Sequence, residues 1–182
     1  TVSTGGIFSI NLVGLTVDNT TITVNTGYFL NFLSTNNYST MPVNITNSTI
    51  TLGGASTNIG FQGSGVLNFD NNNITINSGT PGRLLYSGTS GKTGKITFQN
   101  NTITSTVPYS ANMFDVLTTS AYNITFDNNI IILDNASQNN DSIINLRDQV
   151  SPVIENNIIE TTTTKSAPHI VLTSTGTDCG TP

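Results

Sequence analysis

A short block of residues recurs six times along the chain at nearly equal intervals. In each block an asparagine stands two residues after an apolar residue and three residues before an isoleucine. These asparagines are Asn19, Asn47, Asn71, Asn100, Asn128 and Asn156, at steps of 28, 24, 29, 28 and 28 residues. A fixed period of this size indicates stacked repeats, in which each repeat buries its apolar face against the next.

Apolar and polar residues alternate on both sides of each asparagine. In one repeat the apolar side holds Ile96, Phe98 and Ile103, and the polar side holds Thr97, Thr102 and Thr104. A period of two is typical of a half-buried strand. Asparagine tolerates the left-handed backbone that a sharp corner between two strands requires. The block therefore predicts strand, corner, strand.

A third strand is expected to close each coil, where apolar residues alternate again. These segments include 30–32, 59–61, 84–86, 114–116 and 144–146. In this alignment Leu84 and Tyr86 occupy the same inward columns as Phe114 and Val116. Three strands joined by short turns favour a solenoid in which each strand pairs with its equivalent one coil along. Phe69, Phe98 and Phe126 are then expected to stack inside.

The sequence thus predicts an all-β fold, a right-handed parallel β-helix of about six coils of about 28 residues with three strands per coil. Residues 1–182 form one domain, with 1–12 as an incomplete first coil and 174–182 as a flexible tail. The six repeated asparagines are expected to form a ladder of side-chain hydrogen bonds along one corner, as in other stacked parallel sheets.

Three of the blocks carry a family resemblance. Residues 69–74 are Phe-Asp-Asn-Asn-Asn-Ile, 98–103 are Phe-Gln-Asn-Asn-Thr-Ile, and 126–131 are Phe-Asp-Asn-Asn-Ile-Ile. They resemble the coils of right-handed parallel β-helix proteins of the pectin-lyase-like superfamily, and the resemblance covers almost the whole chain. It implies pectin-degrading enzymes, phage tailspike depolymerases, autotransporter passengers, adhesins or structural rods. The fold alone does not choose among them.

Composition excludes some partners. The net charge is −5 and only five residues are Lys or Arg, so the basic surface that a nucleic-acid partner needs is missing. No apolar run reaches the roughly 20 residues of a membrane span, so no membrane insertion is expected. Cys179 is the only cysteine, which rules out a disulfide within the chain. No motif predicts a cofactor or a metal.

The start at Thr1 predicts a processed or excised chain. The abundance of Asn, Thr and Ser suits an extracellular location or the surface of a cell or virion.

Four carboxylates fall in the column just before the repeated asparagine. The column holds Asp18, Thr46, Asp70, Gln99, Asp127 and Glu155. Asp127 and Glu155 belong to neighbouring coils, a spacing that suits glycoside hydrolysis or a shared Ca²⁺. The alternative is that these residues cap the turn. Because the column recurs and tolerates Thr46 and Gln99, we favour turn capping.

A second candidate set lies on and beyond the third strand: Asp115, Arg147, Asp148 and His169. It is the best available acid–base set for the chemistry of a surface polysaccharide. The alternative is a surface ion pair between Asp115 and Arg147 in adjacent coils, with a solvated histidine.

The strand after the corner carries outward threonines in four coils, similar to the Thr-x-Thr faces of β-solenoid antifreeze proteins. In the last two coils Ile130, Ile132, Ile158 and Glu160 interrupt this array. The three isoleucines predict an exposed apolar patch for association. We therefore expect a non-enzymatic extracellular structural or adhesive protein whose partners are copies of itself or a surface polysaccharide. A tailspike-type module that binds or degrades polysaccharide is the alternative, and ice binding is third.

Overall fold

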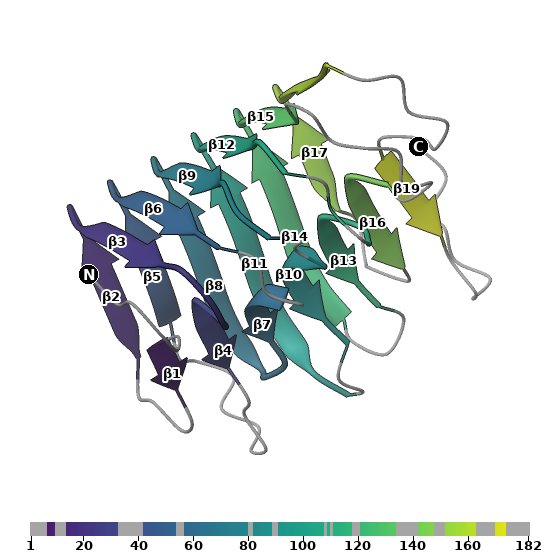
Figure 1. Cartoon of the computed structure of the whole chain (residues 1–182). Coiled ribbons are helices and arrows are strands. Elements are labelled where there is room, and N and C mark those ends of the chain that lie inside the picture. Colours follow the sequence, from purple (N-terminus) through teal and green to yellow (C-terminus); the bar gives the residue numbers. More distant parts are fainter. Residues whose placement is uncertain are drawn as a thin grey trace.

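The computed structural model describes residues 7–9, 14–32, 42–53, 57–79, 82–88, 91–107, 109, 111–117, 121–133, 142–147, 152–162 and 170–173. These residues form three sheets in which all paired strands are parallel (Figure 1). The first sheet contains β1 (Ile7–Ser9), β4 (Leu30–Phe32), β7 (Thr57–Phe61), β10 (Arg83–Ser87), β13 (Phe114–Val116), β16 (Ile144–Arg147) and β19 (Ile170–Thr173).

The other two sheets contain six strands each. The second sheet contains β2 (Leu15–Asp18), β5 (Pro42–Thr46), β8 (Gly65–Asp70), β11 (Thr93–Gln99), β14 (Ala121–Asp127) and β17 (Val153–Glu155). The third sheet contains β3 (Thr21–Val24), β6 (Thr49–Leu52), β9 (Asn73–Ile76), β12 (Thr102–Ser105), β15 (Ile130–Leu133) and β18 (Ile158–Thr161).

Chain order and pairing order together define a parallel β-solenoid. Each strand pairs with the strands three places before and after it, so one coil contributes one strand to every sheet. The predicted all-β solenoid with coils of about 28 residues and three strands per coil is confirmed. In the second and third sheets, four strands have a neighbour on both sides and two lie at the ends. No helix in the described part of the chain is long and apolar enough to cross a membrane.

The corner between the second and third sheets is made in the same way in every coil. All six repeated asparagines have positive φ, between 48° for Asn19 and 56° for Asn156. A residue with a β-carbon pays a steric penalty in this left-handed region, and asparagine is among the residues that tolerate it best. The predicted reason for the repeated asparagine is therefore confirmed.

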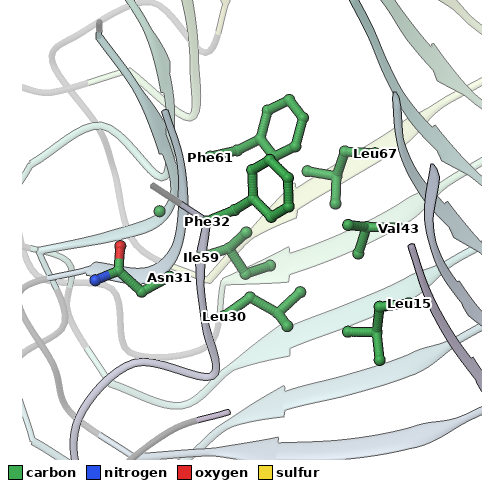
Figure 2. Close-up of a pocket in the computed structure, with 9 residues that line it drawn as sticks. Leu15, Leu30, Asn31, Phe32, Val43, Ile59, Phe61 and Leu67 are labelled. Carbon is green, nitrogen blue, oxygen red and sulfur yellow. The ribbon is translucent and has the colours of Figure 1, made fainter. Parts of the chain in front are cut away.

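The core fills the space between the three sheets with aliphatic columns and an aromatic stack. Phe69, Phe98 and Phe126 are at most 1% exposed. Their rings stack at centroid distances of 4.9 Å and 5.4 Å, as the sequence predicted. Phe114 meets two of these rings edge-on. Near the first coils, the side chains of Figure 2 leave a cavity of about 10 Å³ lined by apolar groups such as Leu30, Ile59 and Leu67. This is at most the space of one water molecule.

One prediction about the first sheet is wrong by one residue. The strand β10 pairs Leu85 with Phe114 and Tyr86 with Asp115, so Tyr86 lies on the outer face. The backbone amides of Leu84 and Leu85 both donate to the carbonyl of Met113, at 2.8 and 3.0 Å, which marks a local bulge. Alternation cannot locate such a bulge, because Leu84 and Leu85 are identical in the sequence and both are fully buried.

The bulge belongs to a column that runs along the start of the first sheet. Its members precede the first regular inward residue of β4, β7, β10, β13 and β16, and each is at most 1% exposed: Phe29, Asn58, Leu84, Met113 and Ile143. Asn58 is the only polar member. Neither its side-chain nitrogen nor its side-chain oxygen has a hydrogen-bond partner. A buried amide without partners destabilises the fold.

Candidate functional site

In the described part of the chain, a hydrogen-bonded ladder runs one residue beyond the corner asparagines, and its middle members are buried. Its members are Thr20, Ser48, Asn72, Asn101, Asn129 and Asn157. Asn72, Asn101 and Asn129 are at most 3% exposed. The backbone amide of each of the first five members donates to the side-chain oxygen of the member in the following coil, at 3.0 to 3.2 Å.

The side chain of Asn101 illustrates how the ladder satisfies its own polar atoms. Its oxygen accepts from the backbone amide and the side-chain amide of Asn72, both at 3.0 Å. Its nitrogen donates to the oxygen of Asn129 at 3.0 Å and to the carbonyl of Phe69 at 2.9 Å. Four bonds around one buried amide offset the cost of removing it from water.

The corner asparagines themselves are exposed and only partly connected to each other. Asn71 donates to Asn47 at 2.8 Å, and Asn128 donates to Asn100 at 2.7 Å. At the other three steps the donor reaches the aspartate before the previous corner: Asn47 to Asp18, Asn100 to Asp70 and Asn156 to Asp127. The continuous ladder is thus one residue further along than the sequence analysis placed it. The Asn-Asn pairs at 71–72, 100–101, 128–129 and 156–157 were the missed signal.

The carboxylates of the corner column act as acceptors between coils. One oxygen of Asp18 accepts from Thr46 at 2.7 Å and from Asn47 at 2.8 Å. These two hydrogen bonds, with that from Thr46 the larger cause, lower the pKa of Asp18 below its ordinary value. Asp127 and Glu155 lie opposite each other in β14 and β17, and Asp127 accepts from Asn156 and Gln99. This geometry suits turn capping and coil-to-coil bonding.

Asp115 lies on the outer side of β13 but is only 1% exposed. One carboxylate oxygen accepts from Nε of Arg83 at 2.8 Å, and the other accepts from Nδ2 of Asn145 at 2.8 Å and of Asn112 at 3.4 Å. The Arg83 guanidinium lies 4.8 Å from the centre of the Tyr86 ring. Because three donors bind its carboxylate and the Arg83 side chain lies against it, Asp115 has little surface left for contact with a substrate.

Of the other three residues in that candidate set, the structure describes only one. Arg147 is half-buried at the end of β16, where the register sets it opposite Thr173. The ion pair described for Asp115 is with Arg83 and joins β13 to β10. Asp148 and His169 lie outside the described residues, as do Cys179 and the tail 174–182.

The outer face of the third sheet has the two columns that the sequence predicted. One column holds Thr21, Thr49, Asn73, Thr102, Ile130 and Ile158. The other holds Thr23, Thr51, Thr75, Thr104, Ile132 and Glu160. Ile130 and Ile158 are neighbours and are 39% and 50% exposed, and Ile132 beside them is half-buried.

Within the described ranges, no group of three or more His, Cys, Asp or Glu residues is arranged to hold a metal ion. Comparison with known proteins identifies no relative: no protein-family model, no curated protein and no solved structure matches the chain.

The two kinds of buried asparagine predict opposite effects of one chemical change. Asn101→Leu removes the acceptor of Asn72 and the donor to Phe69, so we expect the free energy of unfolding to fall by about 2–5 kcal/mol. Asn58→Leu replaces an unpartnered amide in an apolar column, so we expect a gain of about 1–2 kcal/mol. Urea denaturation of both variants measures these changes. A shift of the same sign in both would contradict the assignment of the ladder.

The hydrogen bonds to Asp18 predict a titration effect. Because they favour the charged form, Asp18 should titrate below its ordinary pKa, and its contribution to stability should be present above the unfolded pKa and be lost as the pH falls through the lowered folded pKa. NMR titration of the side-chain carboxyl carbon measures this. Thr46→Val should raise the pKa, whereas Thr46→Ser, which keeps the hydroxyl, should not. An Asp18 pKa that is equal in all three proteins would contradict the prediction.

Proposed function

We propose that the chain is a non-enzymatic structural or adhesive element, such as a surface-fibre subunit, an adhesin or a tail-fibre shaft segment. It acts by associating with copies of itself or with a surface. Its regular coils provide the stiffness of a rod, because parallel backbone bonds, the buried ladder and the aromatic stack all run along the same axis.

The distribution of exposed apolar side chains carries this proposal. In the described part of the chain, the large hydrophobic residues that are exposed all lie in the last coils: Ile130, Val153, Ile158, Ile170 and Leu172, between 37% and 57% exposed. The earlier coils present threonine and asparagine instead. Apolar groups gathered at one end of a regular rod favour contact with another macromolecule over isolation in water.

The use of the acidic residues supports a non-enzymatic role. A general acid or base needs a carboxyl group within reach of a substrate. Asp18, Asp70 and Asp127 accept hydrogen bonds from neighbouring coils, and Asp115 is buried beneath Arg83. Each of these groups thus has a structural use that explains its presence.

We also propose that the protein is located outside the cell or on the surface of a cell or virion. A further proposal is that it is related to the pectin-lyase-like superfamily. Low charge, a single cysteine and a surface rich in Asn and Thr support the location. The recurrent Phe-x-Asn-Asn corner supports the kinship.

Sedimentation velocity and electron microscopy of the purified chain over a concentration series test the proposal. We expect oligomers whose fraction rises with concentration. Ile130→Ser combined with Ile158→Ser should weaken lateral contact by about tenfold or more for each isoleucine that the contact buries.

The matched control is Thr49→Ser with Thr51→Ser, which changes the same outer face in a coil that has a neighbour on both sides and should leave association unchanged. A chain that stays monomeric at the highest concentration and binds no cell-surface polysaccharide would refute the proposed function.

A further inference from the structure

The last described coil of the solenoid exposes residues that belong to core columns. Leu172 lies opposite Leu146, and Ile170 opposite Ile144, so both occupy inward columns. Their partners are at most 2% exposed, whereas Ile170 and Leu172 are 37% and 57% exposed. In the sheet order, β17, β18 and β19 have no neighbour beyond them among the described strands. Within the described residues, the last coil therefore leaves the side chains of two core columns partly uncovered.

The buried ladder is also unfinished at this end, in a directional way. Each member before Asn157 donates its backbone amide to the side-chain oxygen of the member in the next coil. In the described part of the chain, no coil follows Asn157 to accept from its amide. At the opposite end, the Thr20 hydroxyl donates to the carbonyl of Asp18 at 2.8 Å, just as the Ser48 hydroxyl donates to that of Thr46 at 2.7 Å.

Because of that similarity, the Thr20 hydroxyl is an acceptor in the right position, and within the described residues no donor to it is seen. The Ser48 hydroxyl, held in this way, accepts the backbone amide of Thr20 at 3.2 Å. The Thr20 hydroxyl has the same anchor and a lone pair to offer to an amide from a preceding coil. The corner asparagines follow a second rule of the same direction. The backbone amide of each one before Asn156 donates to the carbonyl of the residue that precedes the corner asparagine in the next coil, as Asn19 does to Thr46 and Asn128 to Glu155.

We propose that a second copy of this chain stacks head to tail on the first, with its β2 on β17 and its β3 on β18. The amide of Asn157 then donates to Thr20 of the second copy, and the amide of Asn156 donates to the carbonyl of Asp18. The inward residues Ile154 and Ile159 pack on Val17 and Ile22, which occupy the same two core columns. This interface specifies the partner and geometry of the proposed self-association, and it rests on that function.

The strand count adds a condition to the stack. The first sheet has seven strands and the other two have six, so β19 of one copy and β1 of the next compete for the same place beside β4. The strand β1 has three residues, and its register sets Ser9 opposite Phe32. The strand β19 has four residues and carries apolar side chains at Ile170 and Leu172, which are two positions apart. We infer that β19 replaces β1 in the assembled rod.

Disulfide trapping tests this geometry without touching the core. Thr16 and Val153 both face outward in one column of the second sheet, and the stack places Val153 of one copy beside Thr16 of the next. In a Cys179→Ser background, Thr16→Cys with Val153→Cys should give disulfide-linked dimers, trimers and longer chains on mild oxidation, seen as a ladder of bands on a denaturing gel. The ladder should disappear on reduction.

The control pair is Asn44→Cys with Val153→Cys. Asn44 lies between Thr16 and Asn68 of its own chain, so no second copy reaches it by stacking and no ladder is expected. Equal ladders from both pairs would mean random collision and would overturn the inference. If the unmodified chain forms oligomers but the first pair gives no ladder, the head-to-tail stack is wrong and the proposed function stands. If neither oligomers nor a ladder form, the head-to-tail stack is wrong, and the proposed function is refuted as well when the chain also binds no cell-surface polysaccharide.

Discussion

The structure depends on one directional interaction, the hydrogen bond from a backbone amide in one coil to a buried side-chain oxygen in the next. At the corner between the second and third sheets, the backbone pairing leaves out one amide in each coil, that of the residue after the corner asparagine. This amide would be buried without a partner unless a side chain met it. Asn72, Asn101 and Asn129 supply that oxygen and use their nitrogens to satisfy carbonyls of the strands before the corner.

This interaction explains why the sequence around the corner is so constrained while the loops differ. The first corner residue must adopt positive φ, the second must provide a buried oxygen, and the residue before them accepts bonds from the outside. Aspartate meets the third requirement as the acceptor, whereas Thr46 and Gln99 donate to Asp18 and Asp127 of neighbouring coils, which is why acidic residues recur there. Their repetition follows from coil-to-coil bonding and needs no catalytic explanation.

Periodicity predicted the solenoid, its three strands per coil and the left-handed corners, since each of these repeats in every coil. It predicted the aromatic stack because Phe69, Phe98 and Phe126 occupy one column. The position of the buried ladder was missed by one residue, because Asn100 and Asn101 look equivalent until burial separates them. The bulge at Leu84 and Leu85 and the unpartnered Asn58 depend on where two successive residues both point inward, which alternation cannot resolve. The burial of Asp115 beneath Arg83 depends on tertiary contact between coils.

Amide hydrogen exchange at Asn72 tests most directly whether the ladder joins the coils. In the unmodified chain, at a concentration where it is monomeric, we expect slow exchange at Asn72 and fast exchange at Asn157, whose coil has no described successor. In the Asn101→Leu variant the amide of Asn72 should exchange at least about tenfold faster relative to that of Ile74, which pairs through the backbone alone. Exchange at Asn72 that is fast in the unmodified chain, or unchanged in the variant, would contradict this account.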